Sequence, residues 1–431
     1  LASCQAFFLM NHDVKTDMFL VAMVAVASWQ LVVFARGGQW WNLQLGFLAM
    51  GLAMLSKGPI GVVAPAMALG ADFVIRRDWK GLLNWRWLLG IPIFLVVQIP
   101  FCIGLYDQFG WEGVEFYFWT QSFGRITGDS EWTNDATVFF FVHNFAWSFL
   151  PWVGAAVIAW AKKGYRILRD GIYLPSNAEA VSWAGFFFVF CALSLSRFKL
   201  PHYIFLTYPF AAIMTAELLN DWIDSPRWEK YARILTGVHF GIFILGWLLV
   251  FFLSFWAFPG MHFLWMLLGI AGGLGLVYLY VQFPDRLLRM IVIPAAGFAL
   301  CNFLINVHVY PQLTDYQSTA MAGKHIAEQQ LPPSRVFVYD KSGRALDFYS
   351  GQRMKQVTDV KVAREIAQEA PIYIYTTVRG LEHFQSISGI NVKTLREFEH
   401  FSVAKLSLPF INPSLRPKVL GKRFLLEVSA R

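Results

Sequence analysis

Four polar side chains interrupt an apolar run near the middle of the chain. The stretch SLSRFKLPHYIFLTYPF, residues 194–210, contains Arg197, Lys199, His202 and Tyr203. A charge inside a transmembrane stretch costs about 3 kcal/mol on an insertion scale, so such residues either serve a function or lie at the membrane surface. Cations and a phenol hydroxyl are groups that bind anionic oxygen, including phosphate.

Three further residues break the apolar pattern elsewhere. Asp17 opens an apolar run in NHDVKTDMFL, Lys57 lies in the turn LSKGPIG, and Arg125 lies in a loop containing Gly and Asp, FGRITGDSEW. Each has a structural alternative: a carboxylate caps a helix N-terminus, and a lysine extends its ammonium toward the headgroups. A guanidinium also makes bidentate hydrogen bonds to phosphate.

The composition places these residues in a membrane protein. The 431 residues are 56% hydrophobic and only 15% charged, whereas soluble domains have about 25% charged residues. The net charge of +8 does not indicate nucleic-acid binding, because the Lys and Arg residues fall in short loops between apolar runs. The cysteines lie far apart in apolar stretches without CxxC spacing, which favours core packing: Cys4, Cys102, Cys191 and Cys301.

The apolar runs predict about ten membrane spans. They cover roughly residues 18–35, 43–56, 60–75, 87–106, 137–160, 181–196, 203–220, 234–256, 261–282 and 287–309. Lys and Arg cluster in every second loop, which marks those loops as cytoplasmic. The other loops then lie outside, and they hold all the candidate site residues: Asp17, Lys57, Arg125, Lys199, His202 and Tyr203.

The composition changes to ordinary mixed polar sequence after residue 309. RVFVYD and PIYIYT alternate like half-buried strands, while QSTAMAGKHIAEQQ and VKVAREIAQEA have helical spacing. We therefore predict a transmembrane domain over residues 1–309 and a small extracytoplasmic α/β domain over residues 310–431, the latter without a recognisable catalytic motif. Because the chain starts at Leu1, already in an apolar stretch, we expect it to be a fragment that lacks its N-terminal part.

A carboxylate, several cations and a tyrosine hydroxyl on one membrane face suit an anionic, phosphate-bearing lipid substrate. The cations would bind the phosphate leaving group, and the carboxylate would bind a divalent metal or remove a proton. Simple binding of lipid headgroups fits the same residues.

Four motifs also resemble a known family. VKTDMFL, GLAMLSKGPIGVVAP, FYFWTQSFGRITGDSEW and SLSRFKLPHYIFLTYPFAA occur in the order and spacing of bacterial glycosyltransferase family 39. That family includes protein O-mannosyltransferases and lipid A aminoarabinose transferases. The resemblance covers roughly residues 1–310, and the K-x-P-x-Y element is its most specific piece.

The resemblance implies a GT-C fold and a bacterial inner-membrane enzyme with a periplasmic C-terminal domain. The enzyme would transfer a sugar from undecaprenyl phosphate to a glycolipid such as lipid A or to a protein hydroxyl. Asp17 matches an acidic residue near the catalytic centre and a possible divalent metal, and Lys57 a residue lining the donor cavity. Arg125 matches the arginine that holds the lipid phosphate, Tyr203 the tyrosine of the K-x-P-x-Y element, and Lys199 and His202 neighbour it.

Two departures from the family pattern affect these expectations. The family's principal catalytic carboxylate lies N-terminal to Leu1, so we expect this fragment alone to be inactive. The aminoarabinose transferases have a His-x-x-Pro after the arginine, which ITGDSEWTNDATVFF lacks, so the sugar and the acceptor stay open.

Two other classes of function compete with a transferase. A secondary transporter or flippase would place polar groups near the bilayer midplane in paired halves, whereas here they gather at one face and no half repeats are visible. A non-catalytic protein that binds polyprenyl phosphate would bind the lipid without releasing its sugar.

Overall fold

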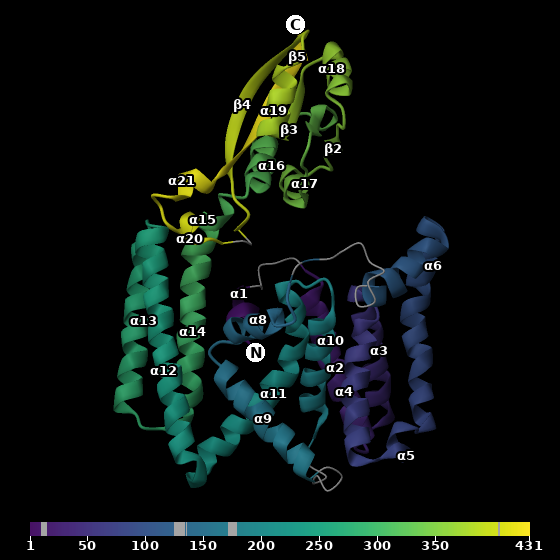
Figure 1. The fold of residues 1–431 in the computed structure, drawn as a ribbon, viewed down its shortest axis with the longest axis vertical. Helices are drawn as coiled ribbons and strands as arrows, with labels where there is room; N and C mark the ends of the chain where they lie inside the picture. The colour runs from purple at the N-terminus through teal and green to yellow at the C-terminus, as the bar shows by residue number, and fades with distance from the viewer. Residues whose placement is uncertain (10–14, 125–133, 135, 171–178, 404–405) are drawn as a thin grey trace. The chain divides into compact units, whose positions relative to one another are not determined.

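The computed structural model describes residues 1–9, 15–124, 134, 136–170, 179–403 and 406–431 (Figure 1). The chain divides into two compact units. One consists of residues 1–244 and 275–299, and the other of residues 245–274 and 300–431.

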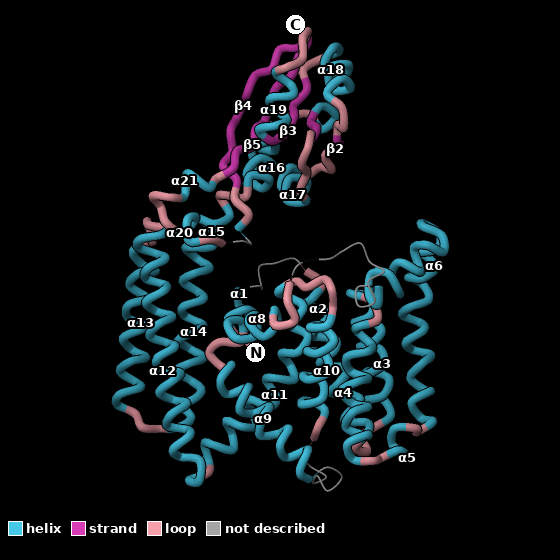
Figure 2. The backbone as a smooth tube through the Cα atoms, viewed as in Figure 1, coloured by secondary structure: helices cyan, strands magenta, loops and turns pink. Residues whose placement is uncertain are grey.

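The first unit is a bundle of apolar helices (Figure 2). Small residues let the helices approach closely: a Cβ on Gly46 would lie 2.5 Å from the side chain of Leu31, and one on Gly61 would lie 2.5 Å from the backbone of Ala53. Its helices are α1 (Gln5–Leu9), α2 (Asp17–Ala35), α3 (Trp40–Lys57), α4 (Ile60–Arg76), α5 (Trp79–Leu82), η2 (Trp85–Gly90), α6 (Ile91–Glu115), η3 (Phe116–Phe123), α8 (Phe140–Ser148), α9 (Val153–Asp170), α10 (Val181–Leu195), η5 (Pro201–Thr207), α11 (Tyr208–Asp224) and η6 (Pro226–Trp228), with part of α12 (Glu229–Phe252), the end of α13 (Phe263–Gln282), η8 (Leu288–Val292) and the start of α14 (Ile293–Leu304).

The helices confirm a polytopic membrane protein. Five helical segments within the described residues are long and apolar enough to cross a membrane, or up to six if one bent pair forms a single span. That pair is α8 and α9, between which the helix axis bends by 120°. The single apolar run predicted over residues 137–160 is therefore two helices, because Pro151 has no N–H to continue the hydrogen-bond ladder.

The second unit contains a five-stranded sheet in the order β2-β1-β3-β5-β4. β1 is parallel to β2 and β3, while β5 is antiparallel to β3 and β4. Its elements after α14 are η9 (Ile305–Val309), α15 (Tyr310–Thr314), α16 (Ser318–Glu328), η10 (Pro333–Arg335), β1 (Val336–Val338), α17 (Arg344–Ser350), β2 (Lys355–Gln356), α18 (Val360–Glu369), β3 (Ile372–Thr377), α19 (Val378–Gln385), β4 (Ile390–His400), α20 (Leu408–Ile411), α21 (Arg416–Val419) and β5 (Gly421–Ala430); η7 (Leu253–Ala257) and most of α13 precede them.

Alternation along the strands gives the sheet two apolar faces. Ile374 and Leu426 pack on one face with residues of α18 and α19, and Tyr375 and Leu425 pack on the other with residues of α16 and α17. The strands predicted in RVFVYD and PIYIYT and the two predicted helices are confirmed. The boundary between residues 309 and 310 stays a prediction.

Arg416 lies in the segment between β4 and β5 and connects that segment to the helix ends of this unit. Its guanidinium donates to the carbonyls of Ala257 (2.6 Å) and Phe410 (2.8 Å) and to the hydroxyl of Tyr316 (3.2 Å). The guanidinium carbon also lies 4.4 Å from the ring centroid of Phe258. One cation therefore satisfies backbone acceptors at the end of η7 and in α20, and it stacks on the aromatic rings between them.

Candidate functional site

Three distant segments of the first unit bring four of the predicted site residues together. Asp17 begins α2, Lys57 ends α3, and His202 and Tyr203 lie in η5. The ammonium of Lys57 donates to Oδ1 of Asp17, and Nε2 of His202 lies 3.6 Å from Oδ2 of the same carboxylate. The Lys57 ammonium also lies 4.0 Å from the centroid of the Tyr203 ring.

Helix ends explain why these charges are stable where they lie. Asp17 is in the first turn of α2, where the helix dipole favours an anion, and Lys57 is in the last turn of α3, where it favours a cation. Gly58 then adopts φ 78°, a left-handed conformation that suits glycine, and Pro59 starts α4. The sequence SKGP therefore fixes the position of the lysine by ending one helix and beginning the next.

The site is mostly buried. The side chains of Asp17, His202 and Lys57 are 9%, 13% and 20% exposed. In such surroundings a charge attracts its partner more strongly than in bulk water, and the ring of Tyr203 adds a cation–π contact to Lys57. The rings of His202 and Tyr203 meet edge to face, with centroids 5.0 Å apart.

Lys199 contacts a different segment from the other four predicted residues, and its predicted role in binding the donor stays a prediction. Its side chain is buried, and its ammonium donates to the carbonyl of Ala136 at 3.1 Å. The side chain of Asn134 bonds both backbone groups of Lys199, accepting from its N–H at 3.2 Å and donating to its carbonyl at 2.7 Å. The structure therefore ties Lys199 to the segment before α8. Arg125 lies outside the described residues.

Tyr117 belongs to this neighbourhood and was not predicted. Its hydroxyl donates to the carbonyl of Met54, which also accepts the N–H of Gly58 at 2.7 Å. This contact fixes η3, which follows a break in α6 at Gly110, to the turn that holds Lys57. The aromatic-rich sequence VEFYFWTQSF offered a signal, but nothing in it distinguishes Tyr117 from its neighbours.

The donor set around Asp17 is small for a divalent metal. Hard cations prefer several oxygen ligands, whereas the carboxylate of Asp17 faces the ammonium of Lys57 and the imidazole of His202. The described part of the chain contains no group of three or more His, Cys, Asp or Glu side chains suited to a metal. A metal at Asp17 therefore stays a prediction.

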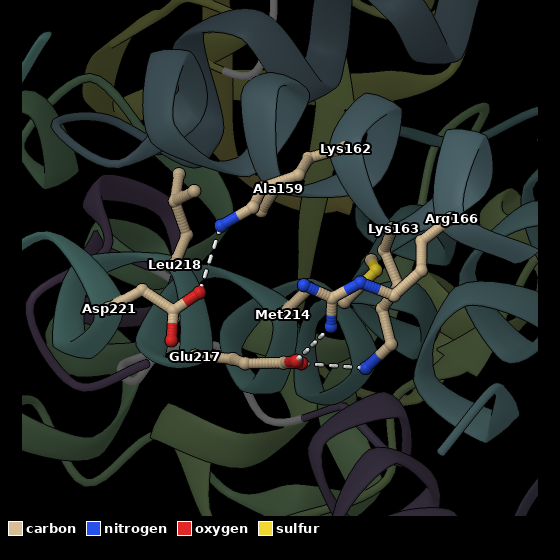
Figure 3. A pocket seen from close by; sticks show the side chains of 8 residues that line it. All are labelled: Ala159, Lys162, Lys163, Arg166, Met214, Glu217, Leu218 and Asp221. Atoms are coloured by element: carbon tan, nitrogen blue, oxygen red, sulfur yellow. Dashed lines mark hydrogen bonds and ion pairs between the residues drawn. The ribbon is translucent and has the colours of Figure 1, made fainter. Parts of the chain in front are cut away.

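A second polar cluster lies in the same unit, where α9 meets α11 (Figure 3). Lys162 pairs with Asp221 at 2.8 Å, and Lys163 pairs with Glu217 at 2.7 Å and with Glu179. The cavity between these side chains holds about 20 Å³, which is room for about one water molecule. These ion pairs therefore connect helices and offer no space for a substrate.

A larger groove of about 430 Å³ lies between α8, α9, α10 and α11. Its lining side chains are apolar or aromatic apart from Cys191, and they include Phe145, Trp160, Phe186 and Phe190. It offers no carboxylate or cation for group transfer, so the cluster around Asp17 is the candidate active site.

Known proteins share this sequence and fold. Residues 1–103 match the family model described as dolichyl-phosphate-mannose-protein mannosyltransferase. An uncharacterized protein of Aquifex aeolicus is 28% identical over 207 residues, which are 46% of this chain and 43% of that protein. The undecaprenyl phosphate-α-4-amino-4-deoxy-L-arabinose arabinosyl transferase of Shewanella sediminis is 20% identical over 271 residues, 61% of this chain and 46% of that protein. The chain thus spans less than half the length of the curated relatives it matches.

A solved structure extends the likeness to the whole fold. The crystal structure of ArnT from Cupriavidus metallidurans bound to undecaprenyl phosphate superposes with a TM-score of 0.70 at 17% identity, covering 99% of this chain and 76% of that one. This likeness confirms the predicted fold class, a polytopic helical membrane protein of the GT-C kind with a small C-terminal α/β domain. Together with the sequence relatives it confirms the predicted resemblance to glycosyltransferase family 39.

Proposed function

We propose that this chain belongs to a membrane glycosyltransferase that takes its sugar from undecaprenyl phosphate. The acceptor would be a glycolipid such as lipid A or a protein hydroxyl. The enzyme would work in a bacterial inner membrane, with the site around Asp17 and the α/β domain on the periplasmic side.

One observation carries this proposal. Asp17, Lys57, His202 and Tyr203 come from three separate family-like motifs, and the fold assembles them into one partly buried cluster at adjoining helix ends. A packing role alone does not require an ammonium, a carboxylate, an imidazole and a phenol in contact, because charged groups in a membrane protein are expensive. The names of the relatives, which include undecaprenyl phosphate as the sugar carrier, support the same donor.

The proposed reaction exchanges one bond at the sugar for another. The bond between the anomeric carbon and the phosphate oxygen breaks, and the polyprenyl phosphate leaves with the bonding electrons. The acceptor oxygen forms the new bond and gives its proton to a base. Lys57, with Tyr203 beside it, would stabilise the charge that develops on the leaving phosphate, and the family resemblance implies the same role for Arg125.

Asp17 would have a supporting role in this scheme. Lys57 neutralises it in the structure, and His202 faces its second oxygen. If Lys57 turned toward a bound phosphate, the dipole at the N-terminus of α2 would still stabilise the Asp17 carboxylate, which could then orient the acceptor. Lys199 would act indirectly, by fixing the start of η5 through its bonds to Asn134 and Ala136.

Transfer of a radiolabelled sugar from undecaprenyl phosphate tests the proposal in the full-length protein. We expect Arg125→Ala and Asp17→Asn each to abolish release and transfer of the label while membrane insertion is kept. Lys230→Met, which removes an exposed lysine at the start of α12, is the matched control and should transfer normally. Tight binding of the lipid without turnover, across several sugar donors, would instead indicate a binding protein or flippase. Addition of a chelator shows whether a metal takes part.

A further inference from the structure

A group of polar side chains lies at one edge of the sheet in the α/β domain. β3 and β4 both run antiparallel to β5, and β1 runs parallel to β3, so β1, β3 and β4 all end at the same edge. Lys341 follows β1, Thr377 ends β3, His400 ends β4, and Arg423 lies near the start of β5. In open α/β sheets the carboxyl ends of parallel strands are where ligands bind, at the point where the strand order reverses. The order β2-β1-β3 places that point between β1 and β3.

The strand register brings two of these groups onto one face. Arg423 lies opposite Thr377 on one side and Phe398 on the other, and His400 follows Phe398 by two residues. Side chains two residues apart share a face, so Arg423 and His400 are diagonal neighbours. Burial lowers the pKa of His400, and the charges of Arg423 and then Lys341 lower it further, which agrees with both cations lying near the imidazole.

A buried hydrogen-bond network sets the orientation of His400. The hydroxyl of Ser318 lies 2.8 Å from that of Tyr375 and 2.8 Å from Nδ1 of His400, and Ser318 and Tyr375 are buried. When Tyr375 donates to Ser318 and Ser318 donates to Nδ1, the proton of the neutral imidazole lies on Nε2. In that arrangement of the protons, Nε2 of His400 is a hydrogen-bond donor beside two cations.

Other charges near this edge already have partners within the sheet. The carboxylate of Asp340 accepts a hydrogen bond from the hydroxyl of Thr377. Lys422 pairs with Glu397 at 2.7 Å, and both residues point to the opposite face from Arg423. Within the described residues, Lys341 and Arg423 form no ion pair with a carboxylate, and the guanidinium of Arg423 donates a hydrogen bond to the carbonyl of Lys422.

The same edge lies next to the helix ends within this unit. β4 leads directly into Phe401, whose N–H donates to the carbonyl of Tyr316 at 2.9 Å, just after α15 (Figure 1). The segment that follows exposes four large apolar side chains close to basic residues: Leu406, Leu408, Leu415 and Val419. Exposed apolar side chains interspersed with Arg and Lys are typical of segments that rest in a membrane interface.

From these observations we propose that Lys341, Arg423 and His400 form a binding site for the phosphate group of a lipid headgroup. Two cations and an imidazole N–H from three elements provide convergent donors, and the apolar residues after β4 would keep the site at the membrane surface. The inference rests on the proposed function in one respect, namely that the α/β domain lies on the periplasmic side of the membrane. If the acceptor is a phosphate-bearing glycolipid, this site would bind its phosphate group.

Binding can be measured without sugar transfer, so failure here is distinguishable from failure of the proposed function. The full-length protein in a neutral detergent is titrated with short-chain phosphatidic acid, short-chain phosphatidylcholine or inorganic phosphate, and amide hydrogen exchange is followed by mass spectrometry. We expect phosphatidic acid to slow exchange in residues 339–344 and 421–424, and the other two compounds to do so only at much higher concentration.

Variants locate the effect. Lys341→Gln combined with Arg423→Gln should raise the concentration of phosphatidic acid needed for this protection by about tenfold or more, because each lost charge-assisted hydrogen bond weakens binding by several-fold. Lys393→Gln is the matched control, since it removes an exposed lysine near the start of β4, at the other end of the strand from His400, and should leave binding unchanged. Unchanged exchange in the core of β3 shows that the double variant is folded. Equal protection by phosphatidylcholine, by inorganic phosphate at the same concentration, or in the folded double variant would overturn the proposal.

Discussion

Replacing Lys57 with methionine should separate the stability of the candidate site from its chemistry. The change keeps most of the side-chain volume at the end of α3 and removes the ammonium that neutralises Asp17. Two unit charges about 4 Å apart attract by about 4 kcal/mol at an effective dielectric constant of about 20. Because the two side chains are 9% and 20% exposed, water screens part of this attraction. Breaking such a pair leaves the buried carboxylate with only the imidazole of His202 beside it, 3.6 Å away, and we expect a loss of about 3 kcal/mol in the free energy of unfolding.

A double-mutant cycle checks that magnitude. Lys57→Met, Asp17→Asn and the double variant are unfolded in mixed micelles, and the transition is followed by tryptophan fluorescence. We expect the double variant to lie within about 1 kcal/mol of the original protein, because removing both charges leaves no buried ion. Sugar transfer should be lost in all three variants, because the two that lack Lys57 lose the ammonium proposed to stabilise the leaving phosphate, and Asp17→Asn loses the carboxylate proposed to orient the acceptor.

Lys163→Met is the matched control for this experiment. Lys163 also neutralises carboxylates near a helix end, so its loss should destabilise the protein by a similar amount. Transfer per folded molecule should nevertheless stay normal, because its cluster has no room for a substrate. The reasoning about Lys57 is refuted if its loss and that of Asp17 are additive, or if the double variant regains transfer.

Three further predictions concern other parts of the chain. Tyr117→Phe should cost about 1 kcal/mol of stability, measured in the same unfolding assay, because it removes only the hydrogen bond to the Met54 carbonyl in the last turn of α3. Arg416→Met should speed hydrogen exchange in α20 and residues 401–403, since several acceptors lose their donor, whereas Lys418→Met, at an exposed position, should not. Because the pKa of His400 is lowered in the folded state, the unfolded chain takes up a proton near the ordinary pKa of 6.5, at a higher pH than the folded chain does. The stability that His400 contributes is therefore complete above that pH and declines as the pH falls below it; unfolding of the α/β domain measured against pH should show a shallower slope in His400→Gln.

The apolar helices of the first unit could be predicted from the sequence because their cause is local. The runs at residues 18–35, 43–56 and 60–75 agree closely with α2, α3 and α4, since a continuous apolar stretch ended by a charged or Gly-Pro turn allows few alternatives. The break between α8 and α9 was not predicted. Hydropathy does not register a change of direction, and a single proline inside an apolar run is compatible with a kinked helix.

The candidate site was predicted in part for a similar reason. Asp17, Lys57, His202 and Tyr203 each break a local pattern, and loop charges place them on one face, so their meeting could be expected. The contacts themselves depend on how α2, α3 and η5 pack, which no local pattern specifies. The contact of Lys199 could not be predicted from its neighbours in the sequence, because its ammonium bonds the carbonyl of Ala136, more than sixty positions away.

The sheet shows the same division between local and distant causes. β1 and β3 are short apolar strands, and both were predicted as strands, but they are buried on both faces rather than half-buried because helices cover the sheet on each side. β4 and β5 were not, although β4 is the longest strand, because its sequence INVKTLREFEH is largely polar and its residues gain their order from pairing with β5.

The α/β domain is attached to the helix ends of its unit at two points. The chain enters it through α15, and between β4 and β5 it returns to the same place, where Phe401 bonds Tyr316 and Arg416 bonds Ala257. A body held by one tether can swivel in every direction, whereas a body held at two points can only rock about the line that joins them. The domain therefore has essentially one rotational degree of freedom, and spin labels on β5 should report a single narrow distribution of distances to α13 that broadens when the Arg416 attachment is removed.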